Sequence, residues 1–132
     1  MRDELPLAGA GPMGHKHLLC DLWLDDTARL QEVGSWPQVL LGVADRIQAR
    51  VIGQQFHQFK PCGVTGFLLL SESHISVHTW PEERLAAIDI FTCGELDPGL
   101  VMAWLRDQLN PTDERVTLHT RGRPLRTGAK AT

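Results

Sequence analysis

A short stretch of the sequence, LLLSESHISVHTWPEE at positions 68–83, carries polar and ionisable side chains inside an otherwise apolar segment. Glu72, Ser73, His74 and His78 together offer an acid, a hydroxyl nucleophile and two imidazoles. Such groups serve in metal binding or in nucleophilic and acid–base catalysis. A single serine or histidine in a strand is most often only a hydrogen-bonded structural residue. A functional interpretation therefore requires that these residues act as a set.

The spacing of the histidines gives little support to a metal site. On a helix, His74 and His78 would share a face, but on a strand they stand about 13 Å apart. The alternation around them is typical of a strand, because Ile75, Val77 and Thr79 point to the opposite side from His78. No Cys-x-x-Cys or His-Glu-x-x-His motif accompanies them. We therefore predict no bound metal.

A conventional serine hydrolase is the second alternative, with Ser73 as nucleophile beside a histidine and an acid. Hydrolases of the α/β class carry the nucleophile in a Gly-x-Ser-x-Gly turn. That motif is absent, and a chain of 132 residues is short for such folds. The sequence gives this alternative no specific support.

The elements that hold these residues follow from hydrophobic periodicity and from helix caps. Helix signals are Ser35 followed by Pro37, and Asp97 followed by Pro98, each ahead of an apolar face that repeats every three to four residues. We expect helices at 35–50 and 97–110, and strands at 17–24, 51–59, 64–70, 73–80, 85–93 and 115–120. This order predicts an α+β fold, a two-layer sandwich of a mainly antiparallel sheet with two helices on one face. The other face would be bare, so we expect a second protomer to cover it in a homodimer.

Composition narrows the class of protein. A hydrophobic content of 42% and a charged content of 22% are those of an ordinary globular protein. A length of 132 residues suits one domain, and we expect flexible ends at 1–14 and 121–132. The net charge of -3 disfavours nucleic acid as a partner. No stretch is apolar enough for a signal peptide or a membrane helix. Cys20, Cys62 and Cys93 are too few for a disulfide framework, so we expect a cytoplasmic, reduced protein.

Three motifs considered together are far more specific than any one residue. SESHISVHTWPE at 71–82, DIFTCG at 89–94 and HQFKPCGVTG at 57–66 resemble the bacterial and archaeal S-adenosylmethionine decarboxylases. The similarity is densest over 54–94 and continues from Gly14 to Thr120. The resemblance implies a pyruvoyl-dependent enzyme, made as a self-cleaving proenzyme, that acts on a small molecule. Its product would be the aminopropyl donor for spermidine and other polyamines.

The resemblance also implies how the cofactor is made. The Ser73 hydroxyl would attack the carbonyl of Glu72, and the resulting ester would break to leave a covalently bound pyruvoyl group derived from Ser73. His78 matches a histidine that assists processing, as the base that takes the Ser73 α-proton. Thr65 matches a hydroxyl residue that also assists, which is usually serine in the family. The expected products are fragments 1–72 and 73–132.

The remaining site residues are implied in the same way. Cys93 matches the proton donor of the decarboxylation. Phe59 and Trp80 match the two rings that would sandwich the adenine. Glu82 matches a carboxylate that would accept hydrogen bonds from the ribose hydroxyls.

The sequence departs from the family pattern at two places. Glu83, Arg84 and Leu85 stand where the family usually has an aromatic residue, a glycine and a second aromatic residue, and WLDD at 23–26 replaces a Gly-Cys-Asp turn. These changes leave open a pyruvoyl-dependent arginine or ornithine decarboxylase, with Glu83 or Asp25 facing the distal cation. An uncleaved regulatory homologue is a further alternative. S-adenosylmethionine is our first choice because all the expected nucleoside contacts are present.

Overall fold

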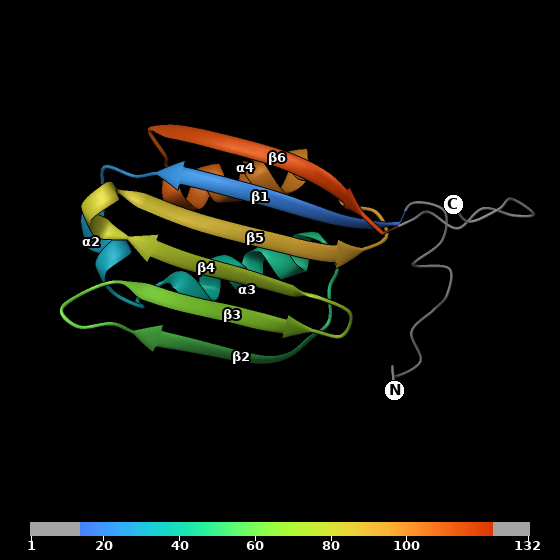
Figure 1. Ribbon diagram of the computed structural model, residues 1–132, viewed down its shortest axis with the longest axis horizontal. Helices are drawn as coiled ribbons and strands as arrows, with labels where there is room; N and C mark the ends of the chain where they lie inside the picture. The colour runs from blue at the N-terminus through green and yellow to red at the C-terminus, as the bar shows by residue number, and fades with distance from the viewer. Residues whose placement is uncertain (1–13, 123–132) are drawn as a thin grey trace, which may run out of the picture.

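The computed structural model describes residues 14–122, so the predicted loose ends at 1–14 and 121–132 lie almost wholly outside the described residues. Six strands, three α-helices and one 3-10 helix follow one another along this part of the chain (Figure 1). In chain order they are β1 His15–Trp23, α2 Thr27–Gln31, α3 Trp36–Arg46, β2 Val51–Gln58, β3 Val64–Leu70, β4 His74–Trp80, η1 Pro81–Glu83, β5 Leu85–Cys93, α4 Pro98–Leu109 and β6 Asp113–Arg121.

The six strands form one antiparallel sheet in the order β2-β3-β4-β5-β1-β6. Strands β2 to β5 are neighbours in sequence and in space, whereas β1 inserts between β5 and β6 (Figure 1). The register places His15 opposite Cys93 and His74 opposite Phe91. The predicted α+β sandwich with a mainly antiparallel sheet is therefore confirmed.

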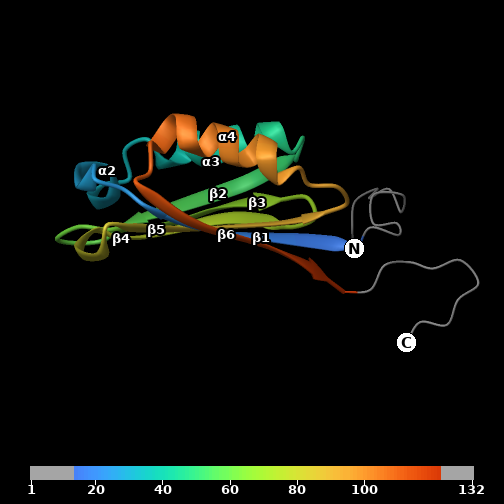
Figure 2. The ribbon, with the colours of Figure 1, turned by 90° about the horizontal axis from the view of Figure 1, so that it is seen from above.

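Helices α3 and α4 both lie on one face of the sheet, and no helix of residues 14–122 covers the opposite face (Figure 2). Because side chains alternate along a strand, one face of each inner strand supplies the apolar core beneath the helices. The largest fully buried side chains are Trp36, Leu18, Leu22, Leu24, Leu30, Leu40, Leu68, Ile75, Ile88, Ile90, Leu105 and Val39. The uncovered surface is called here the open face.

The long helices begin where the sequence predicts. The Asp97 side chain caps α4 by accepting hydrogen bonds from the backbone N–H groups of Gly99, at 2.9 Å, and Leu100, at 3.3 Å. Ser35 is the N-cap of α3, but its hydroxyl accepts a bond from Arg29 Nη1 at 2.8 Å instead of capping the helix. In α4 the side chains of Val101, Met102 and Leu105 are buried, whereas Leu100 in the first turn is 48% exposed.

Helix α2 is an element that the sequence does not predict. Asp26 caps it by accepting from the backbone N–H of Arg29 at 3.3 Å, and Leu30 is fully buried beneath it. The Trp36 indole donates to the carbonyl of Arg29 at 2.9 Å and so ties α2 to α3. This short helix contacts β4 and η1, which carry the candidate site residues.

Candidate active site

The turn between β3 and β4 holds the expected cleavage site. The backbone N–H of Leu70 donates to the carbonyl of Ser73 at 2.9 Å, and that of Ser71 donates to the carbonyl of Arg50 at 3.0 Å. These bonds fix a tight reversal with Glu72 at its tip, half-buried rather than extended into solvent. The Glu72–Ser73 peptide bond is therefore held in a defined position beside the sheet.

Ser73 and Cys93 line the same cavity. It has a volume of about 190 Å³ and is formed by residues 47–50, 70–73, 92 and 93. Cys93 ends β5, and Gly94 follows it with a φ of 84°, a left-handed conformation that glycine adopts without strain. The chain turns away at once, so Cys93 stays at the strand end beside Ser73. This space is called here the serine cavity.

A second cavity, called here the aromatic cavity, gathers most of the other candidate residues. Its volume is about 390 Å³, and its lining is formed by Phe59, residues 62, 63 and 65, and residues 78–82. Phe59 is 46% exposed and Trp80 is 39% exposed, so neither ring belongs to the core. Both rings are available to stack on a flat ligand. Glu82, from η1, lies in the same lining.

Thr65 and His78 form a hydrogen-bonded pair within the aromatic cavity. They lie opposite each other on β3 and β4, and Thr65 Oγ1 stands 3.0 Å from His78 Nδ1. Both belong to the open face, since their neighbours Val64 and Val77 point into the core. When the Nδ1–H donates to the Thr65 hydroxyl, Nε2 keeps its lone pair and can accept a proton. In the other tautomer the Thr65 hydroxyl donates to Nδ1 and Nε2 carries the proton, so the contact fixes the orientation of the His78 ring in either form.

A polar network positions the Phe59 side of the aromatic cavity, and the sequence analysis missed it. The Gln58 amide accepts from the backbone N–H of Val33 at 2.7 Å and donates to the carbonyls of Gln31, Phe59 and Gly63 at 2.7, 3.1 and 3.1 Å. A single side chain therefore joins the end of α2 to the turn that carries Phe59. Nothing in the sequence around Gln58 signals this role, because α2 itself is not predicted.

Thr79 is a second missed residue. Its hydroxyl is buried, donates to the carbonyl of Leu30 at 2.7 Å and accepts from the backbone N–H of Val64 at 2.8 Å. A polar residue that alternates with Ile75 and Val77 on the core side of β4 is the signal that could have revealed it. The network holds α2, β3 and β4 together behind the cavity.

The two departures from the family pattern lie side by side. Arg84 Nη1 and Asp25 Oδ1 form an ion pair at 2.9 Å, and the backbone N–H of Leu24 donates to the carbonyl of Arg84 at 2.9 Å. Arg84 has a φ of 57°, a left-handed conformation that glycine adopts without strain, which agrees with the glycine that the resemblance implies at this position. Neither Asp25 nor Glu83 contributes to the lining of the aromatic cavity.

Within one chain, the candidate residues fall into two separate groups. Ser73, Glu72 and Cys93 belong to the serine cavity, whereas Phe59, Thr65, His78, Trp80 and Glu82 belong to the aromatic cavity. Five positions along an extended strand correspond to about 16 Å, so His78 does not reach Ser73 of its own chain. The predicted set is brought together only in part.

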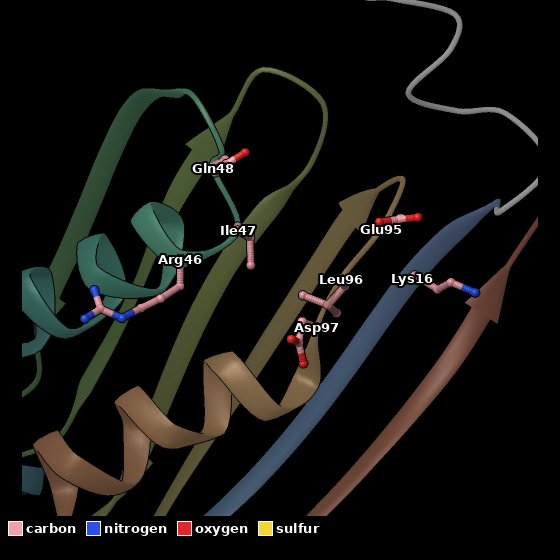
Figure 3. A pocket seen from close by; sticks show the side chains of 7 residues that line it. All are labelled: Lys16, Arg46, Ile47, Gln48, Glu95, Leu96 and Asp97. Carbon is pink, nitrogen blue, oxygen red and sulfur yellow. The ribbon is translucent and has the colours of Figure 1, made fainter.

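A third hollow, of about 390 Å³, adjoins the serine cavity through Ile47 and Gln48 (Figure 3). Its charged side chains are already engaged or turned aside. The Arg46 guanidinium lies 3.9 Å from the centre of the Trp104 ring, and Asp97 caps α4. This hollow offers no convergent set of polar groups.

Cys20 is buried in the core and is not a candidate for catalysis. Burial raises the pKa of the Cys20 thiol to about 12, so this group stays neutral at ordinary pH. Its sulfur packs 3.8 Å from that of Met102 in the core.

Among the described residues there is no cluster of three or more His, Cys, Asp or Glu side chains able to hold a metal ion. Over residues 14–122, no helix is long and apolar enough to cross a membrane.

The protein is thus a two-layer α+β protein in which Ser73, at the tight turn between β3 and β4, lines the same cavity as Cys93. A family model for S-adenosylmethionine decarboxylase matches residues 16–122. The chain belongs to the S-adenosylmethionine decarboxylase family.

Individual relatives agree with the family model. The chain is 38% identical over 107 residues to the S-adenosylmethionine decarboxylase proenzyme of Aquifex aeolicus, covering 80% of this chain and 79% of the relative. It is 44% identical over 95 residues to that of Parasynechococcus marenigrum, covering 71% and 74%. The crystal structure of the adenosylmethionine decarboxylase from Aquifex aeolicus superposes with a TM-score of 0.75 at 33% identity, over 92% of this chain and all of that one.

Proposed function

We propose that this chain is the proenzyme of a pyruvoyl-dependent S-adenosylmethionine decarboxylase, a cytoplasmic lyase that supplies the aminopropyl donor for spermidine and other polyamines. The observation that carries the proposal is the shared cavity of Ser73 and Cys93, the residues expected to provide the cofactor and the proton. The family's curated relatives are proenzymes by name, which supports maturation by cleavage. Residues 14–122 would form a single catalytic domain.

Self-cleavage would begin at the constrained turn. The Ser73 hydroxyl attacks the Glu72 carbonyl, and the amide becomes an ester as the nitrogen leaves. A base removes the Ser73 α-proton, the Glu72 carboxylate departs, and dehydroalanine remains at position 73. Tautomerisation and addition of one water then release ammonia and leave the pyruvoyl group. His78 is the proposed base, and the Thr65 hydroxyl holds its ring through the bond to Nδ1.

The residues around the serine cavity fit the group that this reaction makes. The backbone N–H of Leu70 already donates to the carbonyl of residue 73, which the cleavage retains as an amide carbonyl. When formed, the pyruvoyl group supplies an electrophilic carbonyl that accepts electrons as carbon dioxide departs. Cys93 would deliver a proton to the substrate carbon that loses the carboxylate. A thiol can serve here because it stands in the same cavity.

The aromatic cavity is the proposed nucleoside site. Phe59 and Trp80 would enclose the adenine, and Glu82 would accept hydrogen bonds from the ribose hydroxyls. Asp25, a carboxylate that an arginine or ornithine substrate could use, is paired with Arg84 instead. This pairing supports S-adenosylmethionine as the substrate.

We infer that a homodimer completes the active site. The open face carries exposed apolar side chains, including Phe67, Leu69 and Trp80, which favour burial against a second copy. Ser76 lies midway between the two groups of site residues and also points to the open face. A two-fold axis near Ser76 would bring Ser73 toward His78 of the partner subunit, across facing sheets about 10 Å apart. Each serine cavity would then meet the partner's aromatic cavity.

Release of carbon dioxide, measured in parallel from S-adenosylmethionine, arginine and ornithine, tests the proposed substrate. We expect release only from S-adenosylmethionine, and only after cleavage. Release of carbon dioxide from arginine or ornithine alone would refute the substrate assignment, but it would still agree with a pyruvoyl cofactor. An uncut chain without activity would instead support the regulatory homologue.

A further inference from the structure

Phe91 is the centre of an aromatic cluster on the open face that has no role in the proposed chemistry. Its ring centroid lies 5.3 Å from that of His17, 5.9 Å from His74 and 6.0 Å from His15. The guanidinium of Arg121 stands 5.5 Å from the same ring. Phe91 is thus surrounded by side chains from three other strands.

The cluster sits at the start of β4. His74 is the first residue of that strand, directly after Ser73, and lies opposite Phe91 in the register. The His74 ring also meets His17 edge-on, at a centroid distance of 6.5 Å. The cluster therefore touches the first side chain that follows the expected cut.

The cut changes what holds this point of the chain. In the intact chain, Ser73 is tethered on both sides, through the turn to β3 and along β4. After cleavage, β4 begins at residue 73, and strand ends fray where few contacts fix them. The Leu70–Ser73 backbone bond then joins two separate chains. This backbone bond, the pairing of His74 with β3 and β5, and the side-chain contacts of His74 are then what holds the new chain end.

We propose that the Phe91 cluster, defined as Phe91 with His17 and His74, anchors the new chain end that self-cleavage creates. The inference rests on the proposed self-cleavage and names positioning residues, not catalytic ones. Through His74, the cluster holds residue 73 against the serine cavity, where Cys93 lies two positions beyond Phe91 on β5. Without it, the end of β4 moves away from the thiol.

A second set of contacts keeps the cluster itself in place. His17 Nε2 lies 3.4 Å from Asp89 Oδ2, and Arg121 Nη1 lies 3.2 Å from His17 Nδ1. These contacts link β1, β5 and β6, all of which remain continuous after the cut. The anchor is therefore built on strands that cleavage does not disturb.

A thermal double-mutant cycle separates an anchor for the cut chain from ordinary packing. Phe91→Leu keeps an apolar side chain and removes the ring contacts. The change is made in two backgrounds, the wild-type chain, which is cut, and the Ser73→Ala chain, which stays uncut. We expect Phe91→Leu to lower the Tm of the cut protein by about 3–8 °C more than that of the uncut protein. Phe67→Leu, on the same face and outside the cluster, should lower both equally. His74→Leu removes the same ring contacts from the side of β4 and should show the same larger loss of Tm in the cut protein.

A chemical probe gives a further result that does not depend on turnover. Phenylhydrazine condenses with an accessible keto group and releases water, and mass spectrometry follows the adduct on fragment 73–132. We expect Phe91→Leu to react several-fold faster than wild type, and Phe67→Leu to react at the wild-type rate. Equal Tm losses in cut and uncut proteins, or unchanged trapping rates, would overturn the anchor while leaving self-cleavage intact. A wild-type chain that is never cut would overturn both.

Discussion

Mixing two inactive variants tests how the active site is assembled. Ser73→Ala removes the residue that is cut, and His78→Ala removes the proposed base. In one chain these residues are about 16 Å apart along β4, whereas proton transfer needs contact at about 3 Å. Each variant alone should therefore remain whole. In a mixed dimer, Ser73 of the His78→Ala chain meets an intact His78 from the other chain, so one of the two sites is complete.

The expected yield follows from random pairing. Equal co-expression makes half of the dimers mixed, and one chain in each can be cut, so about a quarter of all chains should be cleaved. Mass spectrometry of the fragments identifies the cut chain, which must be the one that carries His78→Ala. Decarboxylation should return to about the same fraction of the wild-type rate. Absence of any cleavage in the co-expressed sample, with mixed dimers verified by affinity tags, would refute a site shared between chains.

Three further experiments each probe a single feature. Trp80→Ala should raise the KM for S-adenosylmethionine by roughly 5- to 150-fold, from a stacking loss of about 1–3 kcal/mol, and should leave self-cleavage intact. Glu83→Gln should alter neither the KM nor self-cleavage, and equal KM effects of the two changes would contradict the nucleoside site. Arg84→Gly relieves the left-handed strain, which stabilises the fold, and removes the ion pair to Asp25, which destabilises it, by about 1 kcal/mol or less each. The free energy of unfolding measured in urea should therefore change by no more than about 1 kcal/mol. Because the pKa of Cys20 is raised to about 12, its thiol should resist iodoacetamide from pH 7 to 9 in the folded protein, and rapid labelling there would contradict its burial.

Local patterns in the sequence predict most of the sheet and both long helices. The alternation along β4 assigns Ile75 and Val77 to the core and His78 to the open face, because side chains on a strand point to opposite sides in turn. Asp97 predicts the start of α4 because a carboxylate can accept from the free N–H groups of the first turn. Such features depend on neighbours in sequence, so one sequence suffices to find them.

Features that depend on distant parts of the chain escape that approach. Helix α2 is one turn long, too short to show an apolar period, and Leu30 gains its burial only from tertiary packing. The bonds of Gln58 cannot be predicted without α2, because two of its partners, Gln31 and Val33, lie at and beyond the end of that helix.

The division of the site into two cavities is also invisible in the linear motif. Ser73 and His78 are close in sequence, and only the extended geometry of β4 shows that they are far apart in space. Cys93, twenty positions from Ser73, becomes its neighbour through the pairing of β4 with β5. The motifs predict which residues form the site, and the strand register decides which of them can meet.

The intact mass of the purified protein tests the central claim most directly. We predict two fragments, 1–72 and 73–132, with the second lighter by one ammonia, about 17 Da, than simple hydrolysis of the Glu72–Ser73 bond would leave. Ser73→Ala should give a single chain of full mass under the same conditions. A wild-type protein that stays whole after long incubation, or a 73–132 fragment with an ordinary amino-terminal serine, would contradict the account.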